Sequence, residues 1–209
     1  MSLRKEKAAR IRLAILDQAL KLVGKRPFQD LYVDDICAKV KISKVTFFKY
    51  FPQKEDILLY FFRLWCLRRA VELKEKPKQG LSGIQYLFDR LADDCEAFPG
   101  IMLGLVGYLS DPKRPRKPFP VKVEEKVLLF PEVREVNHIE ILSIEQMIEN
   151  FVLEAIFNKE ITRTTSTPEI TRLLSTVLYG TMVTGHLTQQ QPLKMYFRKN
   201  LDMTVKGLA

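Results

Sequence analysis

Apolar residues recur along this chain at spacings of three and four, and no segment shows a sustained alternation of apolar and polar residues. The first spacing places side chains on one face of an α-helix, whereas alternation is typical of a half-buried β-strand. The sequence therefore predicts an all-α protein. Its 209 residues, 46% hydrophobic and 28% charged, are enough for one substantial core or two modest domains.

Prolines, glycines and the apolar spacing set the expected helix boundaries. We expect helices over residues 7–23, 33–39, 43–50, 54–76, 82–97, 101–109 and 131–158, then one starting near Pro168 and one starting at Pro192. Residues 111–120 read DPKRPRKPFP, where four prolines exclude a regular helix and predict a loop. A solubilising surface loop is the favoured interpretation, and binding to DNA or an acidic partner is the alternative.

The three cysteines, Cys37, Cys66 and Cys95, form no CxxC pair, which is typical of a reducing cytoplasm rather than of a disulfide framework or zinc ribbon. The longest uncharged apolar runs, such as residues 101–109, are far shorter than the ~20 residues that span a bilayer. The N-terminus shows no secretory signal pattern. We therefore expect a soluble, cytoplasmic protein without a membrane partner.

The formal net charge is +9, which favours an anionic partner such as nucleic acid or an acidic membrane surface. The excess is uneven, because residues 1–60 hold 13 Lys and Arg against 7 Asp and Glu, a net charge of +6, while the other 149 residues carry +3. Five of these basic residues charge the start of the first helix: Arg4, Lys5, Lys7, Arg10 and Arg12. A basic head on a nearly neutral body is typical of a nucleic-acid-binding protein.

Four short motifs follow one another in the head: ILD at residues 15–17, VDDI at 33–36, ISK at 42–44 and TFFKYF at 46–51. In this order and spacing, residues 14–58 resemble the DNA-binding domain of the TetR family of transcriptional regulators. The resemblance implies a three-helix helix-turn-helix DNA-binding domain over residues 1–53. It also implies a helical effector-binding and dimerisation domain over residues 54–209.

A helix-turn-helix uses one short helix to brace a second helix against the major groove of DNA. The expected buried seam comprises Ile36, Cys37, Val40, Ile42, Phe47 and Phe51. We expect Lys44, Val45 and Phe48 to face base edges, with the apolar side chains on thymine methyls. Phosphate contacts are expected mainly from Thr46, Lys49 and Tyr50. By resemblance, Lys54 matches the family's phosphate-contacting lysine. The full set of expected DNA-binding residues is Tyr32, Ser43, Lys44, Val45, Thr46, Phe48, Lys49, Tyr50 and Lys54.

The chain departs from the family pattern at several of these positions. Lys41 stands where the family usually has glycine, and a positive φ there costs a lysine roughly 1 kcal/mol. Tyr32 replaces the usual Thr or Ser at the start of the second helix, which removes a hydroxyl cap. Ser43 suits the N-cap position of the third helix.

Beyond Lys54 the resemblance is limited to the helix pattern, and it implies a pocket for a small-molecule effector. Aromatic residues gather in the expected lining, which comprises Phe61, Trp65, Tyr86, Phe88, Tyr108 and Phe151. For each residue taken separately, ordinary core packing is the favoured interpretation. Together they indicate an apolar effector, aromatic or lipid-like.

The last two predicted helices carry wide apolar faces, and small residues such as Gly180 permit another helix to approach closely. They can pair with their copies in a second chain as a four-helix bundle. The expected dimer-interface residues are Leu174, Val177, Thr181, Thr184, Phe197 and Leu201. The alternative is that these helices close the chain's own core.

Catalytic signals are weak, since the only histidines are His138 and His186 and no HExxH, GxSxG or phosphate-loop motif occurs. We predict no catalytic residue, no cofactor and no metal site. The predicted function is a ligand-responsive DNA-binding regulator, most simply a repressor that an apolar effector releases from its operator. The alternative is a helical small-molecule carrier or enzyme that kept a degenerate helix-turn-helix.

Overall fold

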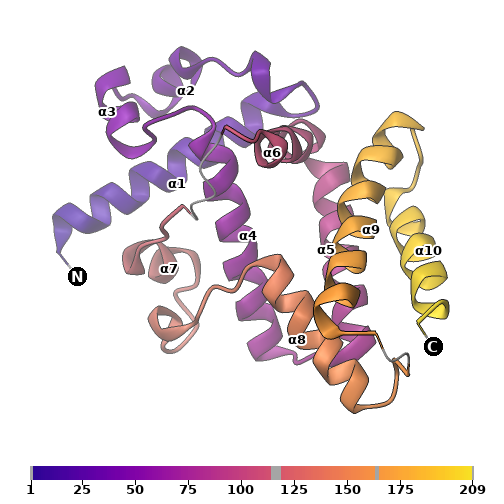
Figure 1. Cartoon of the computed structure of the whole chain (residues 1–209). Helices are drawn as coiled ribbons and strands as arrows, with labels where there is room; N and C mark the ends of the chain where they lie inside the picture. Colours follow the sequence, from indigo (N-terminus) through magenta and orange to yellow (C-terminus); the bar gives the residue numbers. More distant parts are fainter. Residues whose placement is uncertain (1, 114–118, 163–164, 209) are drawn as a thin grey trace. The chain divides into compact units, whose positions relative to one another are not determined.

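The computed structural model describes residues 2–113, 119–162 and 165–208, and over these residues the chain is all-helical, as predicted (Figure 1). All but one of the predicted helices are present. The elements are α1 (Leu3–Val23), η1 (Phe28–Asp30), α2 (Val33–Val40), α3 (Lys44–Tyr50), α4 (Asp56–Glu75), α5 (Gly80–Ala97), α6 (Pro99–Ser110), α7 (Val123–Leu129), η2 (Val136–His138), α8 (Ile144–Phe157), α9 (Thr167–Leu187) and α10 (Leu193–Lys206). In the described part of the chain, no helix is both long and apolar enough to cross a membrane.

The prediction of one long helix over residues 131–158 is wrong. A reciprocal capping box fixes the start of α8 at Ile144, because the Ser143 hydroxyl accepts from the Gln146 amide at 3.2 Å and Gln146 accepts from the Ser143 amide at 2.8 Å. Upstream, Glu135 has φ 57°, which no α-helix accommodates. The sequence analysis also missed α7. Of the predicted loop at 111–120, residues 114–118 lie outside the described residues.

The chain forms two compact units, one of Met1–Val71 with Phe98–Ile141 and one of Glu72–Ala97 with Leu142–Ala209. In the first unit, α1 packs against α2, α6 and α7. The N-terminus of α6 approaches the end of α1 closely, because a Cβ on Gly100 would lie 1.8 Å from the Arg26 carbonyl oxygen. The two units do not coincide with the predicted domains, 1–53 and 54–209. Those domains were predicted by function, and they stay a prediction.

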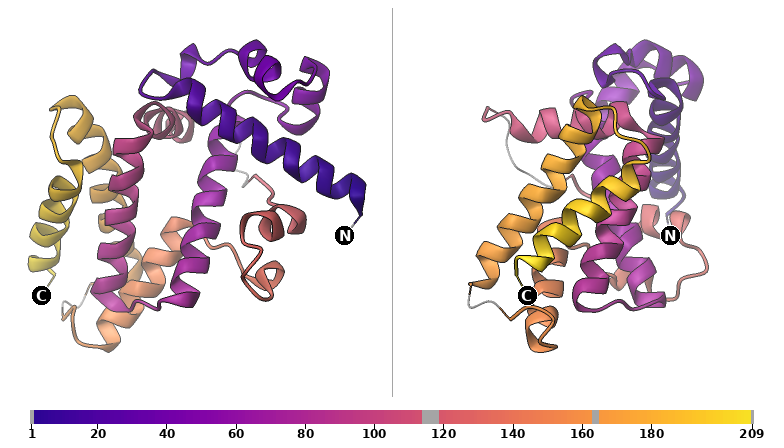
Figure 2. Two further views of the ribbon diagram at one scale, coloured as in Figure 1. Left: turned by 180° about the vertical axis from the view of Figure 1, so that it is seen from behind. Right: turned by 90° about the vertical axis from the view of Figure 1, so that its right-hand side faces the viewer.

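The second unit is a group of four helices in which α5 and α9 each pack against both α8 and α10. α9 and α10 lie side by side in every view (Figure 2). Gly83 in α5 allows the Phe151 ring of α8 to approach, because a Cβ there would lie 2.4 Å from that ring. At the surface, Arg198 of α10 forms a bidentate pair with Asp89 of α5, with both distances 2.7 Å.

Candidate nucleic-acid interface

The turn between α2 and α3 is made by a residue in the left-handed conformation. Lys41 ends α2 with φ 58° and ψ 50°, which confirms the positive φ expected where the family has glycine. The amide of Ile42 then donates to the Cys37 carbonyl at 3.0 Å and closes the turn. The left-handed conformation is unfavourable for lysine, and it sets the angle between α2 and α3.

The N-terminus of α3 is capped as predicted. The Ser43 hydroxyl oxygen accepts from the Thr46 amide at 3.1 Å and lies 3.0 Å from the Thr46 hydroxyl. At the start of α2, Tyr32 makes no side-chain cap and is 67% exposed, which confirms the expected loss of a hydroxyl cap. Both residues lie at helix N-termini, where backbone amides favour phosphate.

The inner face of α3 packs against α2 and fixes the recognition helix. Ile36, Cys37, Phe47 and Phe51 are buried, in agreement with the predicted seam, whereas Val40 and Ile42 are only half-buried. The Phe47 and Phe51 ring centroids are 5.8 Å apart. Burial, with the nearby Asp34 carboxylate, raises the pKa of the Cys37 thiol, as expected for a packing residue.

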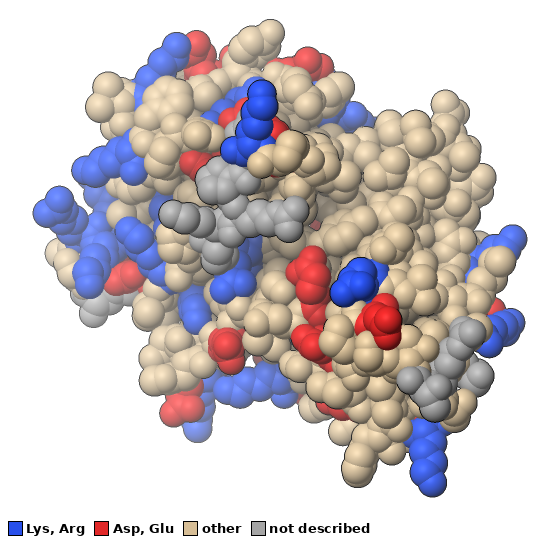
Figure 3. Space-filling view, in the orientation of Figure 1, with Lys and Arg blue, Asp and Glu red and all other residues tan. Residues whose placement is uncertain are grey.

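The outer face of α3 mixes apolar and cationic side chains. Val45 is 81% exposed and Phe48 is 45% exposed, and Lys44 and Lys49 flank them on the surface. Thr46 and Tyr50 are half-buried at the edges of this face. Lys and Arg side chains gather over α1 and α3 in the space-filling view (Figure 3). The structure thus brings the predicted contact residues of α3 together on one surface.

Lys54 has protein partners that the sequence analysis did not foresee. Its ammonium donates to the carbonyl oxygens of Gln29 and Leu31, each at 3.0 Å, and lies 5.2 Å from the centre of the Phe28 ring. It therefore ties the start of α4 to the connection between η1 and α2. Two of its three donors are used in this way, and its predicted contact with phosphate stays a prediction.

Arg12, one of the basic residues near the start of α1, is buried. It is 3% exposed, its Nη1 lies 2.6 Å from Oε1 of Glu125 in α7, and its Nη2 donates to the Pro120 carbonyl at 2.8 Å. A signal existed in the sequence, because Arg12 continues the buried stripe of Ala9, Leu16 and Ala19 at spacings of three and four.

The aromatic residues predicted to line a pocket fall in both units. Phe61, Trp65 and Tyr108 belong to the first unit, and Tyr86, Phe88 and Phe151 belong to the second. Several have ordinary packing partners: Phe61 meets Phe98 edge to face at 6.1 Å, and Phe88 meets Phe197 at 6.4 Å. The Tyr86 hydroxyl donates to Glu72. The effector pocket stays a prediction.

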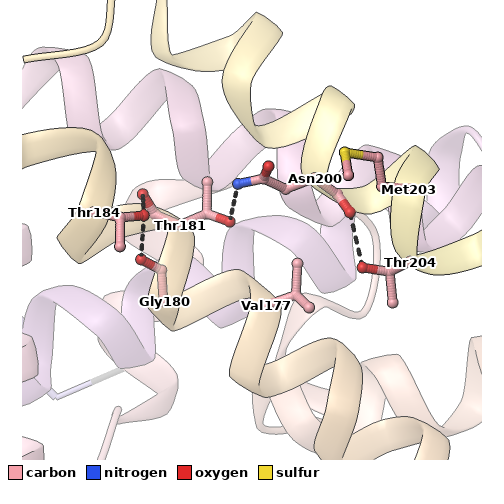
Figure 4. Close-up of a pocket in the computed structure, with 7 residues that line it drawn as sticks. All are labelled: Val177, Gly180, Thr181, Thr184, Asn200, Met203 and Thr204. Carbon is pink, nitrogen blue, oxygen red and sulfur yellow. Dashed lines mark hydrogen bonds between the residues drawn. The ribbon is translucent and has the colours of Figure 1, made fainter. Parts of the chain in front are cut away.

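The predicted dimer residues divide by burial. Leu174, Thr181, Phe197 and Leu201 are buried within the second unit, so their apolar spacing marks the core face of α9 and α10. Their predicted place in the dimer interface stays a prediction. Val177 and Thr184 keep accessible surface. They line an open groove of about 320 Å³ between α9 and α10 (Figure 4).

The arrangement of α1 to α3 defines a helix-turn-helix protein. Residues 15–61 match the family described as bacterial regulatory proteins, tetR family. The regulator EthR of Mycobacterium tuberculosis is 49% identical over 47 residues, which are 22% of each chain, so the match spans about a fifth of that relative.

Solved structures show the same fold over almost the whole chain. FadR from Thermus thermophilus, in complex with lauroyl-CoA, has a TM-score of 0.64 at 19% identity and covers 95% of both chains. FadR from Bacillus subtilis, in complex with stearoyl-CoA, has a TM-score of 0.62 at 17% identity and covers 94% of this chain and 99% of its own. At these identities the likeness concerns the fold.

Proposed function

We propose that this chain is a DNA-binding transcriptional regulator that reads the major groove with α3. The observation that carries the proposal is the outer face of α3, where the exposed apolar side chains of Val45 and Phe48 stand between lysines. The Ser43 cap, the Lys41 turn and the buried Phe47 ring fix this helix. On such a helix the apolar side chains can contact thymine methyls, and the lysines beside them can contact phosphates.

The contacts follow from this placement. Lys44, Val45 and Phe48 face base edges, while Thr46, Lys49 and Tyr50 lie toward the phosphates. Tyr32 and Ser43 contribute from the helix N-termini, where the Ser43 oxygen caps α3 and its hydroxyl lies 3.0 Å from the Thr46 hydroxyl. Lys54 reaches a phosphate with its third donor. Residues 1–53 are the DNA-binding domain in this proposal, and residues 54–209 bind the effector and dimerise.

We further propose that the groove between α9 and α10 is where a second copy of the chain packs. Its lining is uncharged and comprises Val177, Gly180, Thr181, Thr184, Asn200, Met203 and Thr204 (Figure 4). From Leu173 to Gln191 the sequence holds no Asp, Glu, Lys or Arg. Val177, Met203 and the bare backbone at Gly180 permit close approach of a partner helix.

The proposed regulatory mechanism is repression that a small, largely apolar effector relieves, with no enzymatic step, in the cytoplasm. Phe61, Trp65, Tyr86, Phe88, Tyr108 and Phe151 are the proposed lining residues. Two solved structures with this fold hold long-chain acyl-CoA, so lauroyl-CoA and stearoyl-CoA are the first effectors to test. An effector that binds the free protein more tightly than the DNA complex lowers DNA affinity by the ratio of the two affinities.

Selection from a pool of random duplexes tests the proposal. The full chain is expected to enrich one sequence with two half-sites separated by about one DNA turn, ~34–36 Å, or a multiple of it. Val45→Glu places a carboxylate at an exposed position of α3 and is expected to abolish binding to the enriched duplex. The matched control is Leu153→Glu, at an exposed leucine of α8. No enrichment, or wild-type binding by Val45→Glu, would overturn the proposal.

A further inference from the structure

A buried ion pair lies near Phe51, the residue that ends the recognition helix. Arg12 of α1 and Glu125 of α7 form an ion pair in which Arg12 is 3% exposed and Glu125 is 0% exposed. The second Glu125 oxygen accepts from the Lys122 amide at 2.8 Å, and the second terminal nitrogen of Arg12 donates to the Pro120 carbonyl at 2.8 Å. The pair therefore joins the first helix of the chain to a segment more than a hundred residues later.

Three aromatic rings enclose the guanidinium. Its central carbon lies 4.5 Å from the centre of the Tyr60 ring, 4.9 Å from that of Phe119 and 5.8 Å from that of Phe51. The Phe51 and Phe119 rings stack at 5.4 Å with an interplanar angle of 5°. We call Arg12, Phe51, Tyr60, Phe119 and Glu125 the Arg12 cluster. It unites α1, the end of α3, α4, the segment before α7, and α7 itself.

Phe51 connects this cluster to the DNA-binding surface. It is the residue that ends α3, and its amide donates to the Phe47 carbonyl at 2.9 Å. The centre of its buried ring lies 5.8 Å from that of Phe47 and 5.8 Å from the central guanidinium carbon of Arg12. A shift of the guanidinium therefore moves the C-terminal end of α3, because a close-packed core transmits displacement.

A buried ion pair is a weak source of stability, since desolvation of both charges offsets their attraction. The pair does fix the orientation of the Arg12 side chain relative to its neighbours. A guanidinium is planar, and here one terminal nitrogen donates to the Pro120 carbonyl, the other lies 2.6 Å from the Glu125 carboxylate, and aromatic rings surround its central carbon. Apolar side chains of similar volume fill the same space without fixing an angle.

We propose that Arg12 and Glu125 are positioning residues for DNA recognition, which set the angle of α3 and make α7 a required part of the DNA-binding unit. This inference rests on the proposed function and extends the DNA-binding unit beyond residues 1–53. It assigns a role to α7 that the sequence resemblance, which ends before it, does not address.

The test uses the full chain and two duplexes, the one enriched by the wild-type protein and a shuffled duplex of the same length. The variants are Arg12→Met, Glu125→Leu, the double variant and Arg12→Lys. Lys21→Met with Asp17→Leu is the matched control, because it removes an exposed ion pair of 2.7 Å from the same helix, α1. Each variant is measured for its unfolding midpoint and for the ratio of its two dissociation constants.

Each single apolar variant leaves a buried charge without its partner, so its unfolding midpoint falls. The double variant is expected to recover the midpoint but to keep a specificity ratio at least about tenfold below wild type, because no group then fixes the angle of α3. Arg12→Lys keeps the charge, loses the planar guanidinium and is expected to lower the same ratio. The control pair leaves both quantities unchanged.

A double variant that recovers both the midpoint and the wild-type ratio would overturn the inference and leave Arg12 a purely structural residue. If the double variant does not fold, the test rests on Arg12→Lys. A wild-type ratio of the two dissociation constants in that variant would also overturn the inference. A wild-type protein that does not distinguish the two duplexes contradicts the proposed function instead, so the two failures are distinct.

Discussion

Lys44 of α3 and Asp34 of α2 form an ion pair across the helix-turn-helix, with 2.8 Å between Nζ and Oδ1. The hydrogen bond to Asp34 raises the pKa of Lys44. Both side chains are more than half exposed, so the pair contributes little to stability. The pair does bear on DNA binding, because it places a carboxylate beside Lys44, which we propose faces DNA.

Asp34→Asn is expected to strengthen DNA binding. Removal of the carboxylate frees Lys44 and ends a repulsion with phosphate, which is worth about 1 kcal/mol or roughly fivefold in affinity. The free energy of unfolding should change by less than about 0.5 kcal/mol. Fluorescence anisotropy with the enriched duplex measures the affinity. Asp202→Asn, which breaks an exposed pair with Lys206 in α10, is the control, and an equal gain there would show a general charge effect.

Ser43 allows capping and DNA contact to be separated. Ser43→Ala loses the cap on α3 and should cost about 1 kcal/mol of stability. Ser43→Asp keeps a capping oxygen, so stability is retained, but its charge repels phosphate and should weaken DNA binding about tenfold. Chemical denaturation and DNA titration measure the two effects. Wild-type affinity in Ser43→Asp would remove Ser43 from the interface.

Lys41→Gly is expected to stabilise the protein by about 1 kcal/mol. Lys41 has φ 58°, a conformation that costs L-residues energy and costs glycine none. Lys39→Gly is the matched control, because Lys39 lies in the last turn of α2 and glycine there should cost about 1 kcal/mol. Denaturant midpoints distinguish the two. A loss of stability in Lys41→Gly would show that the lysine side chain has a compensating contact.

The helix-turn-helix was predictable because its signals are local. The Ser43 cap and the Lys41 turn each depend on residues within five positions along the chain. The pair of Arg12 and Glu125 depends on residues 113 positions apart and could not be paired by spacing, although the place of Arg12 in an apolar stripe indicated burial. α7 was missed because its N-cap residue is Lys122 rather than Ser, Thr, Asp or Asn, and its start is held by the Glu125 carboxylate, which accepts from the Lys122 amide at 2.8 Å.

In the C-terminal part, the same patterns allowed two interpretations. An apolar stripe on α9 or α10 predicts a buried face but does not say whether the chain's own core or a partner buries it. Leu174 and Phe197 are buried in the chain itself, while their place in a dimer interface stays a prediction. Aromatic residues have the same ambiguity, because core and pocket lining share one composition.

Gly180→Arg tests the proposed dimer. A Cβ at Gly180 meets no other atom within 4 Å in the single chain, so the substitution leaves the fold intact and obstructs only a partner. Gly107→Arg is the matched control, because Gly107 in α6 is equally open. Sedimentation is expected to show a dimer for wild type and the control and a monomer for Gly180→Arg. A dimeric Gly180→Arg would place the interface elsewhere.

The salt dependence of DNA binding tests the central claim most directly. If the outer face of α3 neutralises phosphates, the logarithm of the association constant falls linearly with the logarithm of salt concentration, with a slope of about 0.9 for each phosphate contact. Lys49→Ala should reduce that slope by about one contact without changing which duplex is preferred. Binding that does not depend on salt, or equal affinity for the enriched and shuffled duplexes, would contradict recognition of DNA by α3.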